Sequence, residues 1–243
     1  MRVLALDTTT RAGSAALVED DRIVEERGGD GALTHAARLP AEITTLVAAH
    51  HVALADIDLY AVAPGPGSFT GLRIGIATIQ GLAFVHARRV VAITALDALA
   101  HMARGDAPPG SLIAAWMDAH RGEVFAALYR VTDAAAFSRE GLVEIEGPTA
   151  GPPAATLARW AAQVEALPGR FVGDGATLYA SEIRADSRRA HCGATAACRC
   201  HRTPRAGTPC GGDRSRGDPG PVCPAARCGN RKRRKNTHAR DRH

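Results

Sequence analysis

The feature that most limits how this chain can fold is an abrupt change in composition after residue 186. Residues 187–243 contain only one residue from the set Val, Ile, Leu, Met, Phe, Trp and Tyr, namely Val222, and they hold all six cysteines. They carry 13 Arg and 2 Lys against 3 Asp. Such a segment cannot bury enough apolar surface to offset the entropy lost on ordering, so we predict that it is disordered.

Residues 1–186 have the opposite character and are expected to contain the folded part of the chain. They carry 15 Arg and no Lys against 22 Asp and Glu, and they lack cysteine, so nothing indicates an oxidising compartment. Met1 leads directly into an apolar strand, and no apolar run is long enough to span a bilayer. These features predict a soluble, cytoplasmic protein.

The hydrophobic pattern of residues 1–104 predicts a three-stranded meander followed by alternating helices and strands, an α/β arrangement. Strands are expected at 3–6, 15–18, around Ile23, 59–63 and 90–94. Helices are expected at 33–51, 71–86 and 95–103. Pro40 either kinks the first of these helices or lies in its first turn.

A linker at 104–110, "RGDAPPG", precedes a second unit of similar pattern. Its expected elements are strands at 112–119, 123–131 and near 142–146, a helix near 154–166, and the segment "RFVGDGA" at 170–176. The sequence therefore predicts two mixed α/β lobes, residues 1–104 and a smaller, incomplete lobe of residues 105–186.

The stretch "GPGSFTGLRIG", residues 65–75, joins an expected strand to an expected helix. Backbone N–H groups and the helix dipole at such a turn form an anion site in principle. It is not a Walker A loop, since the first lysine of the chain is Lys232, and Arg73 is the only nearby cation. It is not a nucleophile elbow either, because Ser68 comes one position too early for G-x-S-x-G.

Asp7, at the end of the first strand, is followed by three threonines, Thr8, Thr9 and Thr10. Two interpretations remain open: these groups hold a metal–phosphate group, or they close the hairpin as an Asx or Ser/Thr turn. The histidines of residues 1–186 have no metal-ligand spacing and are expected at the surface or in caps. We therefore predict no catalytic residue and no metal site.

Two long segments carry a family resemblance. "LALDTTTRAGSAALV" and "APGPGSFTGLRIGIATIQGLA" resemble the bacterial TsaB family, also called YeaZ, as do "MDAHRGEVFAALY" at 117–129 and "VGDGA" at 172–176. The resemblance covers residues 1–186. It implies a two-lobe, actin-like fold of the ASKHA, or ribonuclease H-like, type, with mixed sheets and flanking helices.

The resemblance also implies a function in tRNA threonylcarbamoyladenosine modification. TsaB proteins resemble the catalytic subunit TsaD but are non-catalytic scaffolds that form a heterodimer with it. The ATPase TsaE joins them, TsaC supplies threonylcarbamoyl-adenylate, and tRNA is reached through the complex. Whether the chain forms a homodimer without the partner is left open by the sequence.

Carried onto this chain, the resemblance places the partner interface on two helices. The expected interface residues are His35, Leu39, Ile43, Leu46, Gly71, Leu72, Gly75, Thr78 and Ile79. Gly71 and Gly75 leave one face of the second helix nearly bare, which suits the close approach of another helix. The alternative is that this face packs inside the core of its own lobe.

The metal-binding H-x-x-x-H pair of the catalytic relatives is absent, because His35 is followed by Leu39 four positions later. No cofactor is expected to be required, and ATP or ADP is expected to bind only weakly or at the complex interface. A competing hypothesis is an actin-like ATPase or phosphotransferase. Its nucleotide contacts would be Asp7, Thr8, Gly65, Gly67, Ser68 and Arg73. The absent histidine pair and the position of Ser68 argue against a peptidase.

The resemblance stops at the basic segment, for which three hypotheses are open. The first is a frameshift near codons 185–192 of a GC-rich gene. The second is a basic arm that attracts RNA phosphates through "RKRRK" at 231–235. The third is a zinc site, which the absence of any C-x-x-C pair disfavours.

Overall fold

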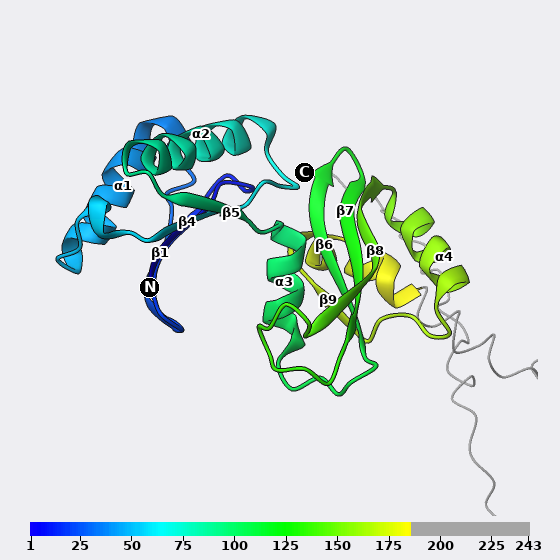
Figure 1. Cartoon of the computed structure of the whole chain (residues 1–243). Coiled ribbons are helices and arrows are strands. Elements are labelled where there is room, and N and C mark those ends of the chain that lie inside the picture. Colours follow the sequence, from blue (N-terminus) through cyan, green and yellow to red (C-terminus); the bar gives the residue numbers. More distant parts are fainter. Residues whose placement is uncertain (186–243) are drawn as a thin grey trace, which may run out of the picture. The chain divides into compact units, whose positions relative to one another are not determined.

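The structure, a computed structural model, describes residues 1–185. Within them the chain forms two mixed α/β lobes, each built on one sheet (Figure 1). The predicted fold class is confirmed, and the predicted helices and strands are present in the expected order. The predictions of disorder, a frameshift, a basic arm or a zinc site beyond residue 186 lie outside the described residues.

The first sheet has five strands in the order β3-β2-β1-β4-β5. The strands are β1 (Arg2–Asp7), β2 (Ser14–Glu19), β3 (Arg22–Gly28), β4 (Leu59–Val62) and β5 (Arg89–Ala92). The first three form an antiparallel meander, and β4 and β5 lie parallel to β1. In the β1–β2 register Asp7 faces Ser14, so the segment between them closes the hairpin.

Helices α1 (His35–Ala49) and α2 (Phe69–Val85) cover one face of this sheet (Figure 1). Alternate strand residues such as Leu4 and Leu6 point toward these helices and are buried beneath them. Pro40 lies inside α1 rather than in its first turn, at a position exposed to solvent. A short 3₁₀ helix, Leu54–Asp56, leads from α1 into β4.

The second sheet has four strands in the order β8-β7-β6-β9. The strands are β6 (Leu112–His120), β7 (Glu123–Val131), β8 (Leu142–Gly151) and β9 (Arg170–Val172). β8 extends past the predicted strand end at residue 146. β9 lies parallel to β6 and pairs with the edge of β6 opposite β7.

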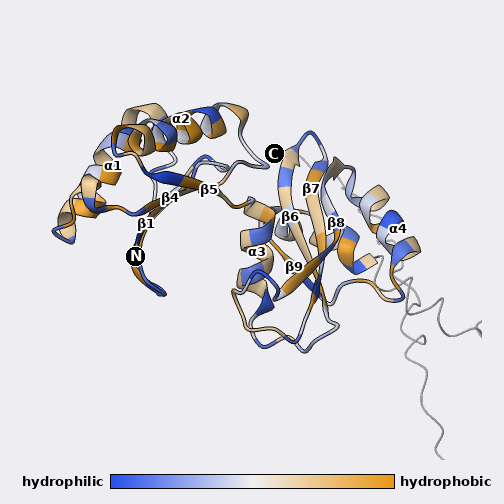
Figure 2. Cartoon of the chain, in the orientation of Figure 1, coloured by the Kyte–Doolittle hydropathy of each residue, from blue (hydrophilic) through white to orange (hydrophobic). Residues whose placement is uncertain are grey.

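Both faces of the second sheet are covered by helices. Helix α3 (Ala95–Arg104) packs on one face, and α4 (Pro153–Gln163) packs on the other, where Trp116 and Trp160 meet. Because β6 is covered on both sides, it needs a continuous apolar run rather than an alternating pattern. The sequence "LIAAWM" supplies that run, and the neighbouring strand β7 is largely apolar in Figure 2.

The division into lobes at residue 104 stays a prediction, although the packing of α3 bears on it. Leu96 and Ala100 of α3 are buried in the core of the second sheet, not the first. Helix α3 therefore belongs structurally with the elements that follow it. Within residues 1–185 no helix combines the length and the apolar character needed to cross a bilayer.

Candidate functional site

The loop that follows β1 is an Asx turn. Asp7 Oδ1 accepts a hydrogen bond of 2.7 Å from the backbone N–H of Thr9, and Thr10 Oγ1 accepts one of 3.0 Å from that of Gly13. This is the turn interpretation of the Asp-Thr-Thr-Thr sequence. The remaining oxygen of Asp7 is left available to a cavity beside the loop.

Glycines surround this loop and allow α2 to approach it closely. A Cβ atom on Gly67 would lie 2.5 Å from the carbonyl oxygen of Thr9. A Cβ atom on Gly71 or Gly75 would lie within 3.0 Å of Thr8. Side chains larger than hydrogen are thus excluded where the N-terminal half of α2 meets the β1 loop. The "GPGSFTGLRIG" stretch is shaped for packing inside its own lobe.

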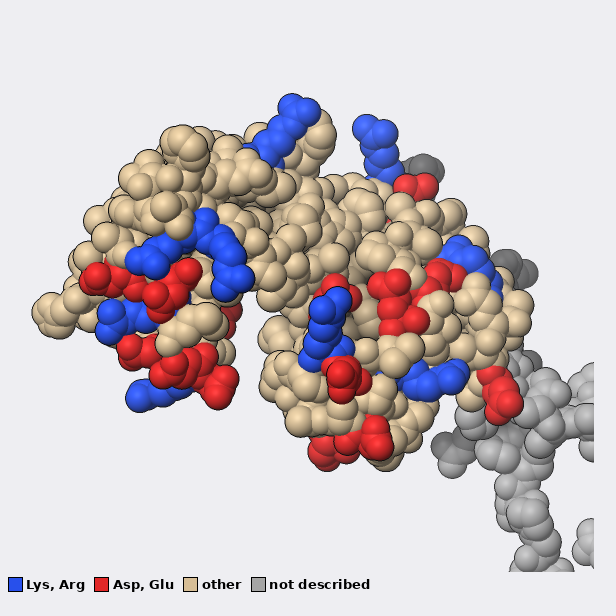
Figure 3. Space-filling view, viewed as in Figure 1, with Lys and Arg blue, Asp and Glu red and all other residues tan. Residues whose placement is uncertain are grey.

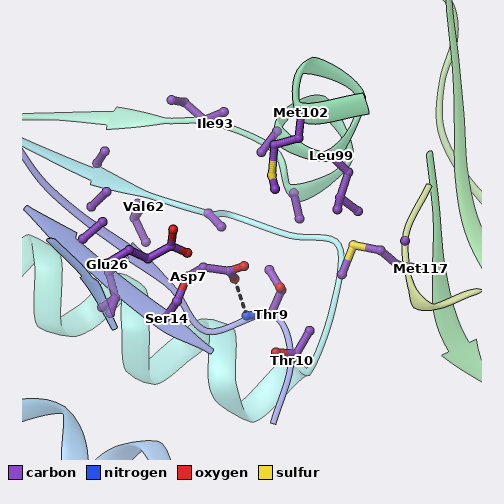
Figure 4. Close-up of a pocket in the computed structure, with 18 of the residues that line it drawn as sticks. Asp7, Thr9, Thr10, Ser14, Glu26, Val62, Ile93, Leu99, Met102 and Met117 are labelled. Carbon is purple, nitrogen blue, oxygen red and sulfur yellow. Dashed lines mark hydrogen bonds between the residues drawn. The ribbon is translucent and has the colours of Figure 1, made fainter. Parts of the chain in front are cut away.

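A cavity of about 430 Å³ opens beside the loop (Figure 4). Asp7, Glu26 and Thr9 line it from the first lobe. Apolar side chains of Ile93, Leu99, Met102 and Met117 also line it, and Figure 4 shows them across the space from the two carboxylates. The cavity combines acidic groups with an apolar wall.

A second hollow, of about 840 Å³, lies at the N-termini of α1 and α2. Gly67, Ser68 and His120 are among its lining residues. Ser68 caps α2, because its Oγ accepts a hydrogen bond of 3.3 Å from the backbone N–H of Gly71. His120 Nδ1 lies 3.1 Å from an oxygen of Asp118.

Comparison with known proteins identifies the family. The family model described as "TsaD: tRNA N6-adenosine threonylcarbamoyltransferase" matches residues 25–168, which is more than half of the chain. TsaB of Bacillus subtilis is 33% identical over 130 residues, covering 54% of this chain and 56% of that protein. TsaB of Escherichia coli is 35% identical over 130 residues, covering 54% of this chain and 55% of that protein.

Among solved structures, YeaZ from Pseudomonas aeruginosa superposes with a TM-score of 0.58 at 30% identity. The match covers 74% of this chain and 79% of that one. The chain belongs to the TsaB (YeaZ) family. It spans about half the length of the curated TsaB relatives that it matches.

The partner interface expected from TsaB proteins stays a prediction, although most of its residues are buried within this chain. Leu39, Ile43, Leu46 and Ile79 are at most 3% exposed and form the core between the helices and the first sheet. Gly71 and Gly75 are buried against Thr8, while Leu72 and Thr78 are only partly exposed. Helical spacing identified an apolar face correctly, but that face turns toward its own sheet.

His35, another residue of the predicted interface, is also buried. It is 7% exposed, its Nε2 lies 3.0 Å from the carbonyl oxygen of Thr10, and its Nδ1 lies 2.8 Å from a guanidinium nitrogen of Arg38. Arg38, itself buried, donates to the carbonyl oxygen of Ala12 and pairs with Glu42. These two α1 residues hold the β1–β2 loop, a role that the sequence pattern did not reveal.

The solvent-exposed sides of α1 and α2 form a surface that we call the outer helix face. On α1 it consists of Ala36, Ala37, Pro40, Ala41, Thr44, Thr45, Ala48 and Ala49. On α2 it consists of Phe69, Thr70, Arg73, Ala77, Gln80, Gly81, Phe84 and Val85. Arg73 is its one charged member, and Figure 3 shows few charged side chains over these helices. Phe84 is 88% exposed.

The residues predicted to contact a nucleotide are not brought into one site. Asp7 lines the acidic cavity, and Gly67 and Ser68 line the second hollow. Thr8 is fully buried against Gly75. Gly65 is buried and lines neither the cavity nor the second hollow. The Arg73 guanidinium lies 3.9 Å from the ring centre of Phe69.

Metal ligands do not gather in this part of the TsaB fold. Within residues 1–185 no group of three or more His, Cys, Asp or Glu side chains is placed to hold a metal ion. Sequence reasoning missed Glu26 and Asp174, because only the fold brings β3 and the start of α5 (Asp174–Leu178) to the same cavity as Asp7.

Proposed function

We propose that this chain is a non-catalytic scaffold subunit for tRNA threonylcarbamoyladenosine modification. It pairs with TsaD and acts with TsaE and TsaC. Family membership supports the pathway, since its relatives in B. subtilis and E. coli are named tRNA threonylcarbamoyladenosine biosynthesis proteins. Because the chain spans about half the length of these relatives, activity in the pathway must be tested on this chain itself.

The observation that carries the proposal is the outer helix face. Exposed helix surfaces usually display charged side chains, whereas the α1 part of this face consists only of alanine, threonine and proline. Depletion of charge together with an exposed aromatic residue is typical of the centre of a protein interface. The small side chains of α1 allow a partner helix to approach closely, and Phe84 provides an apolar anchor.

The test is light scattering on a size-exclusion column, with the full chain alone and then mixed with TsaD from the same organism. We expect a one-to-one complex that Phe84→Asp weakens at least tenfold, because a buried carboxylate without a partner is costly. The matched control is Phe137→Asp, since Phe137 is 74% exposed but lies in the second lobe.

Failure to form a complex, or equal effects of the two substitutions, would overturn the proposal. Light scattering of the chain alone shows whether it forms a homodimer. If Phe84→Asp dissociates that homodimer, the same face forms both the homodimer and the complex with TsaD. The rival ATPase hypothesis predicts ATP turnover by the isolated chain that Asp7→Ala abolishes. The described lining of the Asp7 cavity contains no Lys, Arg or His that would neutralise a phosphate.

A further inference from the structure

The first sheet carries helices on one face only. Helices α1 and α2 both lie on the side toward which Leu4 and Leu6 point (Figure 1), and no other helix within residues 1–185 contacts this sheet extensively. The strand residues that alternate with these two point to the opposite side, which we call the open sheet face. The strand registers place on it Val3, Ala5, Ala16, Val18, Ala61 and Val91.

The open sheet face is apolar although no described helix covers it. Ala5, Ala16 and Ala61 form its floor, and they also line the cavity of about 430 Å³, so the floor is hollowed. Val91 is 37% exposed, and Ile93, two residues further along the chain, is 49% exposed. A solvated sheet face normally displays polar side chains, whereas a continuous exposed apolar surface indicates an interaction site.

The second lobe shows what covers the corresponding face there. Its strand order β8-β7-β6-β9 repeats β3-β2-β1-β4, and helix α4 precedes β9 as α1 precedes β4. The face opposite α4 is covered by α3, which buries Leu96 and Ala100 against the sheet. Within residues 1–185 the open sheet face lacks the counterpart of α3. We therefore expect its occupant to be a helix.

The chain itself does not supply this helix. Helices α1 to α4 each bury one apolar side in the core of their own lobe. The exposed side of α2 carries Phe84, but that side belongs to the outer helix face. Residues 187–243 contain one large apolar residue, Val222, which is too few for the apolar side of a helix. A helix that covers the open sheet face therefore comes from another protein.

The charges beside the alanine floor narrow the choice of helix. Asp7 and Glu26 line the same hollow, and neither belongs to an ion pair formed within residues 1–185. Arg89, which the registers also place on this face, lies on β5, two strands away from Asp7. A helix with Lys or Arg along the margin nearest β3 complements the two carboxylates, since opposite charges across an interface favour association and fix its orientation.

We propose that the open sheet face binds an amphipathic helix of another protein, with large apolar side chains on one side and Lys or Arg at its margin. The apolar side packs on the alanine floor, and the basic side chains lie next to Asp7 and Glu26. This surface and the outer helix face lie on opposite sides of the first sheet, so both partners can bind at once. The inference goes beyond the scaffold role and does not depend on TsaD binding.

The experiment uses the full chain and three fluorescein-labelled peptides of about 15 residues, which as helices are about 22 Å long, the length of a six-residue strand. The first carries Leu along one side of the helix and Lys at the margins. The second has Glu in place of every Lys, and the third has the residues of the first in an order without helical spacing.

Fluorescence anisotropy measures affinity, and amide ¹H–¹⁵N shifts locate the bound peptide. We expect the Lys peptide to bind about tenfold more tightly than the Glu peptide, because only its charges complement the carboxylates. The third peptide should show no saturable binding. Shifts should appear at Ala5, Ala16 and Ala61 and be absent at Ala77 on the outer helix face.

Two neighbouring valines of the edge strand β5 provide a matched pair of variants. Val91 and Val90 are 37% and 41% exposed, but Val90 pairs with Tyr60 and points to the side of α1 and α2. Val91→Lys should weaken binding of the Lys peptide about tenfold, because it replaces apolar contact with a like charge. Val90→Lys should leave the affinity unchanged.

Two neighbouring glutamates test the charge in the same way. Glu26→Gln should weaken binding of the Lys peptide several-fold, because it removes one carboxylate from the open sheet face and little volume. Glu25→Gln is the control, since Glu25 pairs with Arg27 and His50 and lies opposite the buried Leu17 in the strand register.

Absence of saturable binding by the Lys peptide would overturn the proposal, as would equal effects of Val91→Lys and Val90→Lys. Equal affinity for the Lys and Glu peptides would overturn the assigned charge of the partner. Light scattering tests a second copy as the occupant: self-association that Val91→Lys alone abolishes, without peptide binding, would also overturn the proposal. Since these titrations omit TsaD, their failure is distinguishable from a failure of complex formation.

Discussion

The two lobes repeat one order of elements but bury different cores. In each, a three-stranded meander is followed by a helix and by a fourth strand that lies parallel to the first: β1–β3, α1 and β4 in one lobe, β6–β8, α4 and β9 in the other. The first sheet then gains a fifth strand, β5, whereas the second has four within the described residues.

The repeat extends to the glycines that follow each fourth strand. Gly71 and Gly75 bring α2 against Thr8 just beyond the end of β1. In the second lobe, a Cβ atom on Gly173 or Gly175 would lie within 3.0 Å of the backbone of Trp116 or Met117 on β6. In both lobes, therefore, the start of a helix closely approaches the end of the first strand. This close packing accounts for glycine at these positions, and no bound ligand is needed to explain it.

The cores differ in chemistry. The first is aliphatic apart from Tyr60, while one face of the second sheet buries Trp116 and Trp160 at a ring-centre distance of 5.9 Å. Helices and strands that pack extensively on one another belong to the same lobe throughout residues 1–185. Both tryptophans of the chain lie in the second lobe, so tryptophan fluorescence reports on that lobe alone.

The largest effect is expected from truncating a core residue of the first lobe. Leu46 is 0% exposed, and Leu46→Ala should lower the free energy of unfolding of the first lobe by about 4 kcal/mol. Circular dichroism during urea unfolding should then show an earlier transition, while the midpoint of tryptophan fluorescence stays where it was. An equal shift of both signals would show that the lobes unfold as one unit, which would break the comparison.

A somewhat smaller effect is expected at the repeated glycines. Gly71→Ala and Gly175→Ala should each destabilise their own lobe by about 3 kcal/mol, since the new Cβ atom meets backbone atoms that cannot move away. Urea midpoints should fall by circular dichroism for the first variant and by fluorescence for the second.

Gly81 supplies the control for these two variants. It lies in the same helix as Gly71, but a Cβ atom there would meet nothing within 4 Å. Gly81→Ala should therefore stabilise the first lobe by about 1 kcal/mol through helix propensity. If Gly71→Ala were equally harmless, the close-approach explanation of the motif would be wrong.

These contrasts also show what the sequence could predict. Helices and strands were located well, because periods of two and 3.6 residues are local properties of the chain. The same periodicity marked Leu39, Ile43 and Leu46 as an apolar face but carried no information on what would cover it. Whether this face is covered by its own sheet or by a partner protein depends on tertiary packing, which the periodicity does not encode.

The acidic cavity was harder still to predict. Asp7 stood out because it ends a strand before three threonines, whereas Glu26 and Asp174 have no distinctive neighbours in the sequence. Only the pairing of β1 with β2 and β3, and the position of α5, bring these carboxylates to one cavity. For the outer helix face, the sequence offered one signal: the alanines and threonines that stand at α1 positions where charged side chains are usual.

A smaller loss of stability than at Leu46, Gly71 or Gly175 is expected in a polar cluster that only the second lobe buries. Glu146 of β8 accepts hydrogen bonds from Arg159 at 2.7 Å, Trp160 at 2.9 Å and Gln163 at 2.9 Å. The hydrogen bonds from Arg159 contribute most to lowering the pKa of Glu146 to about 2. In the first lobe, Arg27 and His50 lower the pKa of Glu25 in a more exposed setting.

Because the folded-state pKa of Glu146 lies below the ordinary value of 4.5, its stabilising effect is present above about pH 4.5 and is lost as the pH falls toward 2. Glu146→Gln should cost about 2 kcal/mol at pH 7, a figure reduced for the partial exposure of Arg159. Fluorescence-detected urea unfolding at pH 7, 4 and 3 should show the variant approaching the wild type as the pH falls. Glu25→Gln should leave that signal unchanged, because Glu25 belongs to the lobe without tryptophan. A constant gap between wild type and Glu146→Gln from pH 7 to pH 3 would instead mean that the carboxylate contributes through packing rather than through its charge.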